Sequence, residues 1–587
     1  MTRRIVLGVV GGGALVAAVI APFFISTFTL TIATNALVFA IFAVSLNLVL
    51  GYAGLPSLGH AAFFGTGAYA VALLTQSGIH SFLLGVAVAI AASALLGAAL
   101  GRILLRTRGI YFLMATLAIG EVMHNLAVSW RTVTNGDDGL YGIRLPGLLA
   151  DGVRFYLFLL AALVAVVAVA GMLARSPFGY TLRAVRDNRN RASVLGVSPL
   201  TFEMAAFVIG AAIAGFAGAM FAYAKGFVSP GVLSLETSAD GLLMVVLGGP
   251  ATLLGPVVGA VVVEAIRGIG STYTERWLTV LGLLACIVAL DPGRYLRRLS
   301  HRQKAETTLP GTAPAAEISG PPPMLVPQQA AATPRPSSGQ RTAMQAVGIA
   351  KRFGGLNVLT DISISIAAGE RRGLIGPNGA GKTTFLNILS GLVRPDKGCV
   401  RLGDRDITMM PPFERAKLGI GRTFQIGNLF NDNTVRENIL IGLLTRDGYG
   451  LHCARALSRY DKLQKEASRL LCEWGLRELE NVPVKLLAYG QRRLVEVVLA
   501  VSQGPRVLLL DEPAAGLSGH ETKAIIQAIT ALNPEVSLLI VEHDMDLVFS
   551  VCDSVTVIAN GRVLAEGTGD TVRQDKTVIE AYLGMPL

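Results

Sequence analysis

Cysteine is scarce in this 587-residue chain, and the five that occur are scattered along it. None belongs to a C-x-x-C pair, and none shows the spacing of a metal site. The sequence therefore predicts neither a disulfide framework nor a thiolate metal centre. Most of the cysteines lie in the C-terminal half, which suits a reducing cytosol: Cys286, Cys399, Cys453, Cys472 and Cys552.

Charge is also sparse, but only in the first 290 residues, where long apolar blocks dominate. A helix needs about 20 apolar residues to cross a bilayer. Two further apolar stretches, 51–76 and 240–266, are interrupted by glycine and proline. Broken segments are tolerated at membrane depth only where protein or a water-filled cavity covers the freed backbone, so they hint at a transport path. The blocks of near-sufficient length are 5–23, 31–50, 82–104, 110–129, 154–174, 201–224 and the shorter 277–290.

The net charge of +11 could indicate nucleic-acid binding, but its distribution favours another interpretation. Arginines gather in the short loops 102–109 and 175–200, whereas loop 130–153 carries acidic residues. This is the positive-inside pattern, which reports orientation in a membrane and no nucleic-acid partner. We expect the first two loops to be cytoplasmic and the third to be external.

The start, Met-Thr-Arg-Arg before an apolar run, imitates a signal peptide, but no small-residue cleavage site stands out. We interpret it as a first transmembrane helix with its N-terminus inside. A cytoplasmic C-terminal domain then requires an even number of spans. Splitting 240–266 at Gly248-Gly249-Pro250 gives ten spans, and eight is the alternative.

Composition divides the chain into three parts. Residues 1–299 should form an all-α membrane domain. Residues 300–341 hold eight prolines with Ala, Ser, Gly and Gln, which predicts an extended linker. Strand-like and helix-like patterns alternate over 342–587, as in a nucleotide-binding α/β domain.

A complete G-x-x-x-x-G-K-[ST] motif occupies residues 376–383 of the third part. It follows a predicted strand at 371–375 and precedes a predicted helix at 384–392, which is the context that the motif needs. Backbone N–H groups and the helix N-terminus would hold the phosphates. Lys382 would reach the β- and γ-phosphates, and Thr383 would bind Mg²⁺. We expect ATP to contact Gly376, Pro377, Asn378, Gly379, Ala380, Gly381, Lys382, Thr383 and Thr384.

A second motif, the apolar run 507–510 followed by Asp511 and Glu512, is typical of a buried strand that ends in two acids. Asp511 suits the Mg²⁺ shell, and Glu512 suits polarisation of the attacking water. The alternative is a strand that ends in an ordinary polar turn, which the upstream phosphate loop makes much less plausible.

With these residues in place, the third part resembles the ATP-binding-cassette ATPases. Residues 487–491 (Leu-Ala-Tyr-Gly-Gln) resemble the family signature. The resemblance implies a Q-loop glutamine at Gln425, which also approaches Mg²⁺, a switch histidine at His543 and an adenine-stacking aromatic at Phe353. It also implies that the signature residues Ala488, Tyr489, Gly490 and Gln491 complete the phosphate site of a second cassette. A lone cassette should then be nearly inactive.

Two positions depart from the usual pattern of that family. Ala488 stands where a serine would contact phosphate, so one contact is lost while the backbone donors remain. Ser518 stands where an aspartate is usual, which puts the cross-dimer contact near the opposite site in doubt.

Finer detail resembles the branched-chain amino-acid (Liv-type) importers. In the cassette, 352–355, 422–425, 487–494 and 512–517 resemble their first ATPase subunit. In the membrane part, 46–54, 109–112, 176–179 and 226–230 resemble their permease subunit. The resemblance implies a natural fusion that needs a second permease, a second ATPase (or a second copy of itself) and a periplasmic binding protein.

The basic loop 176–200 is the candidate coupling element, with a short helix near 181–191 docking beside Gln425. The alternative is a solvated loop facing anionic lipid. Ionisable and amide residues also occur inside predicted spans, and there we favour helix–helix hydrogen bonding over substrate contact. They are Asn47, Glu121, His124, Asn125, Asp240 and Glu264.

The leading hypothesis is an ATP-driven importer of branched-chain or related amino acids in a bacterial inner membrane. A urea or short-amide importer built on the same subunits is the near alternative. A homodimeric half-size exporter is disfavoured by the short loops and broken spans. A membrane-anchored ATPase regulator would not need so many spans.

Overall fold

The computed structural model describes residues 13, 15–273, 276–289, 342–424 and 429–583, and within them the chain forms two compact units. The first comprises Met1–Arg186 and Leu200–Pro314, and the second Asp187–Pro199 and Ala315–Leu587. The predicted linker 300–341 lies outside the described residues, so the three-part division of the chain stays a prediction. Of the predicted helix over 5–23, residues 5–12 and 14 also lie outside them, whereas residues 15–20 are helical and lead into η1.

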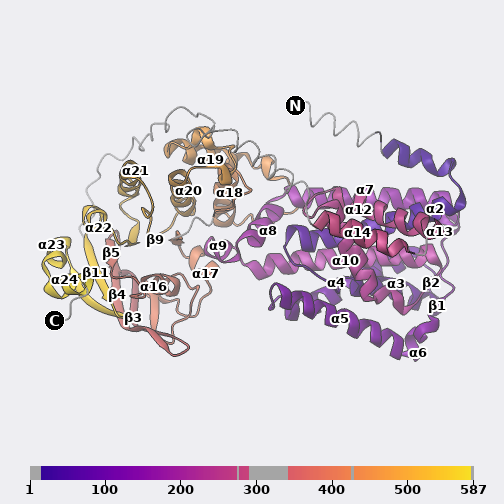
Figure 1. The fold of residues 1–587 in the computed structure, drawn as a ribbon, viewed down its shortest axis with the longest axis horizontal. Helices are drawn as coiled ribbons and strands as arrows, with labels where there is room; N and C mark the ends of the chain where they lie inside the picture. The colour runs from indigo at the N-terminus through magenta and orange to yellow at the C-terminus, as the bar shows by residue number, and fades with distance from the viewer. Residues whose placement is uncertain (1–12, 14, 274–275, 290–341, 425–428, 584–587) are drawn as a thin grey trace. The chain divides into compact units, whose positions relative to one another are not determined.

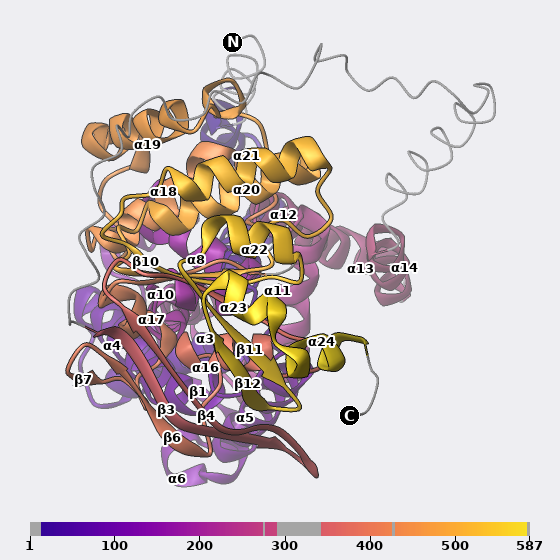
Figure 2. The same cartoon turned by 90° about the vertical axis from the view of Figure 1, so that its left-hand side faces the viewer.

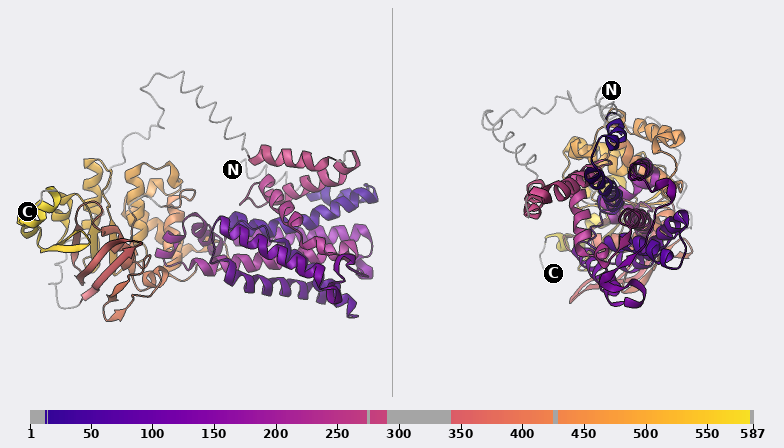
Figure 3. Two further views of the ribbon diagram at one scale, coloured as in Figure 1. Left: turned by 60° about the horizontal axis from the view of Figure 1, so that its bottom comes forward. Right: turned by 90° about the vertical axis from the view of Figure 1, so that its right-hand side faces the viewer.

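The first unit is a bundle of long helices (Figure 1, indigo to magenta; Figure 3). Five of its helices, among the described residues, are long and apolar enough to cross a membrane. These five are α2 with its π-helical end η2, α4, α5, α7 and α10: Thr27–Tyr52, Phe82–Leu104, Ile110–Ser129, Gly152–Arg175 and Pro199–Lys225. Each coincides with a predicted span, which confirms those five blocks as helices. The count of ten spans stays a prediction.

Shorter elements complete the first unit. A two-residue antiparallel pair, β1 (Leu140–Tyr141) with β2 (Phe227–Val228), joins two of its connections. The remaining helices and turns are η1 Ala21–Phe23, α3 Ala61–Gln76, α6 Arg131–Thr134, η3 Gly136–Asp138, η4 Gly147–Leu149, α8 Pro177–Asp187, η5 Pro230–Leu233, α11 Leu235–Gly248, α12 Gly255–Ala265, η6 Ile266–Gly270, α13 Ser271–Tyr273 and α14 Trp277–Ala289.

Both predicted breaks occur. The stretch 240–266 is divided at its glycines and prolines into α11 and α12, and an irregular segment separates η2 from α3. The buried Asn47 side chain satisfies the backbone at the break between α11 and α12. Its Nδ2 donates to the Thr252 carbonyl (2.8 Å), and its Oδ1 accepts from the Ala251 N–H (2.9 Å). Backbone groups that leave a helix are thereby satisfied by a neighbouring helix, as an apolar surrounding requires.

The polar span residues meet the expectation of helix–helix hydrogen bonding only in part. His124 Nδ1 lies 3.0 Å from the Pro230 carbonyl oxygen in η5, and Asn125 donates to the Glu121 carbonyl one turn earlier (2.8 Å). Asp240 and Glu264 differ, since both pair with Arg267, a residue that the sequence interpretation did not single out.

The second unit is built on two sheets (Figures 1 and 2, orange to yellow). The four-stranded antiparallel sheet has the order β4-β3-β6-β7, and the six-stranded sheet has the order β12-β11-β5-β10-β9-β8. The strands are β3 Thr342–Phe353, β4 Leu356–Ala367, β5 Arg371–Ile375, β6 Lys397–Leu402, β7 Arg405–Asp406, β8 Ile420–Arg422, β9 Val507–Asp511, β10 Ser537–Val541, β11 Ser554–Ala559 and β12 Arg562–Gly567.

Strands β11, β5, β10, β9 and β8 run parallel, and only β12 is antiparallel to its neighbour. The central strands β5, β9 and β10 are buried at every position, which explains the mainly apolar sequences of β9 and β10. The predicted strand at 371–375 is confirmed residue for residue.

Helices surround these sheets, and α16 packs its Phe385, Leu386 and Leu389 into the core between them. The helices are α16 Lys382–Leu389, α17 Pro412–Lys417, η7 Leu457–Arg459, α18 Val435–Arg446, α19 Asp461–Glu473, η8 Arg477–Leu479, η9 Val484–Leu486, α20 Tyr489–Val501, α21 Gly519–Thr530, α22 Met545–Val551, α23 Gly569–Gln574 and α24 Lys576–Leu583.

A short segment from the middle of the chain belongs to this second unit. Residues Asp187–Pro199, which contain α9 (Arg189–Val194), cluster with the ATPase-type sheets and helices. The bounds of the predicted docking helix, 181–191, are wrong, because α8 ends at Asp187 and α9 begins at Arg189. The chain breaks at Asn188, whose side chain caps α9 by accepting from the Arg191 N–H (2.9 Å).

Candidate functional site: a nucleotide site at the carboxyl edge of the sheet

The loops that carry the predicted chemistry leave the same edge of the six-stranded sheet. Strands β5, β10 and β9 are adjacent and parallel, with Leu374 opposite Val541 and Val541 opposite Asp511. The phosphate loop follows β5, Glu512 follows β9 and His543 follows β10 shortly after its end. Parallel topology thus brings three separate motifs to one edge, where ligands bind in open α/β sheets.

The phosphate loop has the backbone geometry that its glycines allow. Gly379 and Gly381 have φ of +82° and +100°, values that side chains with a Cβ rarely adopt. Lys382 begins α16 and is buried, with its ammonium donating to the carbonyls of Gly376 (2.7 Å) and Pro377 (3.0 Å). Burial lowers the pKa of Lys382, and the nearby acids Glu512 and Asp511 oppose that change.

Thr383 and Thr384 occupy the first turn of α16, and Thr383 is exposed at its surface. Asn378 and Gly379 are exposed at the crest of the loop, whereas Ala380 is buried beneath it. The crest of the loop and the N-terminal turn of α16 are therefore accessible, and a helix N-terminus is a favourable place for phosphate.

Asp511 ends β9 in a buried position with one oxygen engaged. Its Oδ2 lies 3.3 Å from an Nη atom of Arg422, and both side chains are almost fully buried. Its Oδ1 is buried and has no hydrogen-bond partner among the described residues. Burial raises the pKa of the Asp511 carboxyl, while Arg422 opposes the rise. A carboxylate oxygen left in this state fits a hard cation such as Mg²⁺, and the Thr383 hydroxyl is of the same ligand class.

Glu512 has a backbone conformation that is unusual for its side chain. Its φ is +46°, in the left-handed region that costs a non-glycine residue energy. Its N–H donates to the Val541 carbonyl (2.8 Å), and its own carbonyl accepts from Arg493 (3.1 Å). Backbone strain of this kind concentrates at functional positions, which supports attention to Glu512 independently of the motif.

Glu542 connects the loops after β9 and β10, and sequence interpretation missed it. Its carboxylate accepts from the Ala514 N–H (2.8 Å) in the turn beyond Glu512 and from the His543 N–H (3.2 Å). Glu542 is buried, and burial raises its pKa. The His543 side chain is 59% exposed and projects from this tether. The position of Glu542, directly before His543 at a strand end, was the sequence signal that could have identified it.

The signature residues lie at the N-terminus of α20. Ala488 is the N-cap residue and has no side-chain oxygen, but its N–H donates to Gln491 Oε1 (3.1 Å). Tyr489 is exposed, and Gly490 is buried beside Glu521 of α21. Within the described residues no hydrogen bond joins these residues to the phosphate loop.

Ser518 has a clear local role. It caps α21, with its side chain accepting from the Glu521 N–H and its N–H donating to the Glu521 carboxylate (2.9 Å). This is a capping box, which the S-x-x-E spacing would have revealed.

Phe353 lies apart from the other predicted residues, at the end of β3 in the four-stranded sheet. Its ring is 49% exposed and lies 5.4 Å from the Lys351 ammonium. One face of the ring is therefore accessible for stacking on a flat ligand. Gln425 lies outside the described residues.

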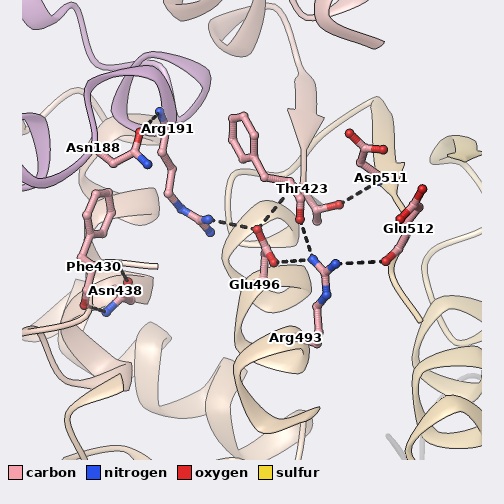
Figure 4. A network of polar contacts seen from close by, with 10 residues as sticks. Asn188, Arg191, Thr423, Phe430, Asn438, Arg493, Glu496, Asp511 and Glu512 are labelled. Atoms are coloured by element: carbon pink, nitrogen blue, oxygen red, sulfur yellow. Dashed lines mark hydrogen bonds and ion pairs between the residues drawn. The ribbon is translucent and has the colours of Figure 1, made fainter. Parts of the chain in front are cut away.

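A buried polar network joins the residue before Gln425 to Glu512 (Figure 4). Glu496 of α20 accepts from the Phe424 N–H (3.1 Å) through one carboxylate oxygen and from Arg493 (2.9 Å) through the other. Arg493 in turn donates to the carbonyls of Phe424 and Glu512. Glu496 thus holds the start of the loop that contains Gln425, and Arg493 holds the backbone of Glu512.

Arg191 of α9 extends the same network (Figure 4). Its Nη1 donates to Glu496 (3.0 Å), and the side chains of Arg191 and Glu496 are 3% and 1% exposed. Its guanidinium also lies 6.0 Å from the centre of the Phe424 ring. The sequence showed the basic loop, but nothing in it indicated that this arginine, among its neighbours, would be buried against Glu496.

Family models of known proteins match both halves of the chain. The family model described as the permease component of branched-chain amino acid transport systems matches residues 28–290. The ABC transporter model matches 359–515, and a model described as a branched-chain amino acid ATP-binding cassette transporter matches 562–584.

Three curated relatives match the cassette. The branched-chain amino acid transport ATP-binding protein BraF of Pseudomonas aeruginosa is 39% identical over 251 residues, which cover 42% of this chain and 98% of BraF. LivG of Escherichia coli is 37% identical over 40% of this chain and 96% of its own length. The lipopolysaccharide export ATP-binding protein LptB of Acidithiobacillus ferridurans is 35% identical over 41% of this chain and 96% of its own.

Because an export ATPase also matches, overall similarity of the cassette does not separate the subgroups, whereas the permease match and the match of the cassette segment 562–584 do. The expected fusion is therefore present. A nucleotide-binding cassette with the strand order above and a multi-pass bundle of apolar helices lie on one polypeptide, in which ATP hydrolysis is coupled to transport. The chain belongs to the branched-chain amino-acid family of ABC transporters, with its permease and ATP-binding parts fused.

Proposed function

We propose that this chain is the fused permease and ATPase subunit of an importer for branched-chain amino acids. The observation that carries the proposal is the presence, on one chain, of the permease match over 28–290 and of the cassette segment 562–584, both described for branched-chain amino acid transport. We place the protein in a bacterial inner membrane with the N-terminus and the cassette in the cytoplasm, because arginines gather in loops 102–109 and 175–200.

In the proposed ATP site, backbone N–H groups of residues 378–384 and the Lys382 ammonium hold the phosphates, with Gly376 and Pro377 shaping the start of the loop. The unpartnered Oδ1 of Asp511, with Thr383 and Gln425, provides ligands for Mg²⁺. The metal would screen phosphate charge there. Glu512 orients and polarises the attacking water, His543 contacts the γ-phosphate, and Phe353 stacks on adenine.

The site is completed by a second cassette. Ala488, Tyr489, Gly490 and Gln491 surround an exposed helix N-terminus, which favours an anion such as the γ-phosphate of a nucleotide on the other cassette. A second permease, a second ATPase and a periplasmic binding protein are therefore the proposed partners. A second copy of this chain is the alternative source of the cassette.

Arg191 is the proposed coupling contact between transport and hydrolysis. Through Glu496 it reaches the backbone of Phe424, and through Arg493 that of Glu512. A shift of α9 would therefore act on the loop that contains Gln425 and on the position of Glu512 together.

The proposal is tested by uptake of labelled leucine, urea and an aromatic amino acid in cells that carry the gene, lack it, or carry Lys382→Ala. We expect leucine uptake to require the gene and to be lost in the variant, because the phosphates lose their cationic ligand. Lys465→Ala, which removes an exposed lysine of α19, is the matched control. Uptake of urea in place of leucine would refute the cargo, and full uptake by Lys382→Ala would refute the ATP site.

A further inference from the structure

The membrane unit contains a cavity of about 430 Å³ to which nothing above assigns a role. Its walls come from α2, α3 and α10, from the turn η5, and from the broken segment α11–η6. Ligand pockets typically measure about 300–1,000 Å³. The cavity is therefore large enough to hold a small organic molecule.

Charged side chains of both signs line this cavity. Arg267 lies between Asp240 of α11 and Glu264 of α12, pairing with the first and lying 3.0 Å from the second. Two carboxylates thus share one guanidinium, which leaves an excess of negative charge at a partly buried place. Ionisable residues inside spans are costly and mark substrate or ion pathways.

Two more charged residues line the cavity without an ion pair among the described residues. Glu236 lies one turn before Asp240 on α11, so the two carboxylates share a helix face. The ammonium of Lys225, at the end of α10, lies 5.8 Å from the centre of the Phe221 ring. Outside the Arg267 cluster, the lining therefore offers one cation, Lys225, and one carboxylate, Glu236, to a ligand.

The same cavity also has an aromatic surface. Phe39, Phe64 and Phe221 all line the cavity, with ring centres 5.9 Å apart for Phe39 and Phe64 and 5.4 Å apart for Phe64 and Phe221. Packed rings of this kind form a rigid apolar surface. A ligand with an aliphatic side chain would bury that side chain here.

The backbone around the cavity is irregular in the way that membrane binding sites are. Arg267 lies in η6, a π-helical turn, and such turns are frequent at functional sites.

From these observations we propose that the cavity binds a zwitterionic amino acid with an aliphatic side chain during its passage. Asp240 and Glu236 face the ammonium group, Lys225 faces the carboxylate, and the phenylalanines contact the side chain. The excess of carboxylates favours the ammonium, and the separate lysine selects against amines that lack a carboxylate. The inference rests on the proposed import function and assigns a site within it.

The test is direct binding of labelled leucine to the purified full-length chain, in the absence of any binding protein. Leucine should compete with itself, whereas leucine amide, which lacks the carboxylate, and 4-methylpentanoate, which lacks the ammonium, should compete poorly. Lys225→Met and Glu236→Gln should each weaken binding about tenfold, as expected for loss of one charged hydrogen bond. These residues are chosen because neither belongs to the Arg267 cluster that packs the segment.

Two controls separate binding from folding. Lys225→Arg keeps the charge and should restore most of the binding, and Glu121→Gln removes a span carboxylate outside the cavity and should bind as the unaltered chain does. Equal thermal stability of the variants shows that they fold. Two results would overturn the site. One is unchanged leucine affinity in Lys225→Met and Glu236→Gln, and the other is competition by leucine amide and 4-methylpentanoate that equals competition by leucine.

Failure of this site is distinguishable from failure of the import function. If cells take up leucine through the unaltered chain but Lys225→Met leaves the binding of leucine to the purified chain unchanged, only the cavity assignment fails. If cells carrying the gene take up no leucine, the function fails first. Binding of a monovalent cation that leucine does not displace would also overturn the assignment.

Discussion

Polar side chains serve different ends in the two units. In the membrane unit, Asn47 and His124 bind backbone carbonyls where the chain leaves its helices. In the ATPase unit, Glu496 and Glu542 each bind two segments that carry predicted chemistry. Removing a group of the first kind should therefore change stability, whereas removing one of the second kind should change rate or coupling.

The largest effect that separates the two units should come from Glu512→Gln. The substitution keeps the size of the side chain but removes the base, and a positioned base contributes about 10²–10⁴-fold to rate. ATP hydrolysis by the assembled transporter should fall by that order while nucleotide still binds. Hydrolysis is measured by phosphate release and binding by a fluorescent nucleotide.

Glu535→Gln is the matched control, because that glutamate is exposed and remote from the sheet edge in sequence. Turnover at the normal rate in Glu512→Gln would remove Glu512 from its proposed role and would leave its left-handed backbone unexplained.

The next effect tests whether the Arg191 contact transmits between activities. Arg191→Met keeps the length of the side chain but removes its charge from Glu496, which Arg493 still binds. We expect leucine uptake per ATP hydrolysed to fall at least tenfold, because breaking a buried ion pair costs about 3–5 kcal/mol and about 1.4 kcal/mol already corresponds to a factor of ten. Both rates are measured on the same reconstituted transporter.

Arg191→Lys keeps the charge and should retain part of the coupling. Arg394→Met, at an exposed position of the same unit, is the control and should transport as much leucine per ATP as the unaltered chain. A purely structural role would lower uptake and hydrolysis in proportion. An unchanged ratio of the two in Arg191→Met would therefore contradict the coupling role.

The smallest effect should come from the membrane unit. Asn47→Ala leaves the Ala251 N–H and the Thr252 carbonyl without their partner, at a cost of about 1–3 kcal/mol. The melting temperature of the purified chain should fall, while the KM for leucine should stay the same. Asn125→Ala removes only a local bond within α5 and should melt like the unaltered chain. A changed KM with unchanged melting in Asn47→Ala would reverse the comparison.

Local patterns predicted much of the fold. Helices α4 and α5 have the predicted bounds, since uninterrupted apolar runs leave few alternatives. Strand β5 and the start of the phosphate loop were predictable for another reason, because a strand directly before a glycine-rich turn is a local signal of the motif.

Pairings between distant segments were not predictable. Arg191 is one of several arginines in its loop, and its burial depends on Glu496, which comes much later in the sequence. Arg267 and Asp240 likewise meet only because α11 and α12 fold back on each other. Glu542 was overlooked because its role follows from the register of β10 beside β9. Residues 425–428 lie outside the described part, so the Gln425 prediction stays a prediction.

The membership of Asp187–Pro199 in the second unit has a consequence for synthesis. Arg191 leaves the ribosome more than 200 residues before Phe424 and Glu496 exist. At roughly 5–20 residues per second, the delay is on the order of 10–50 s. During that interval the Glu496 carboxylate has not been synthesised. Completion of the cassette, rather than insertion of the spans, therefore sets the time at which α9 can form its buried ion pair.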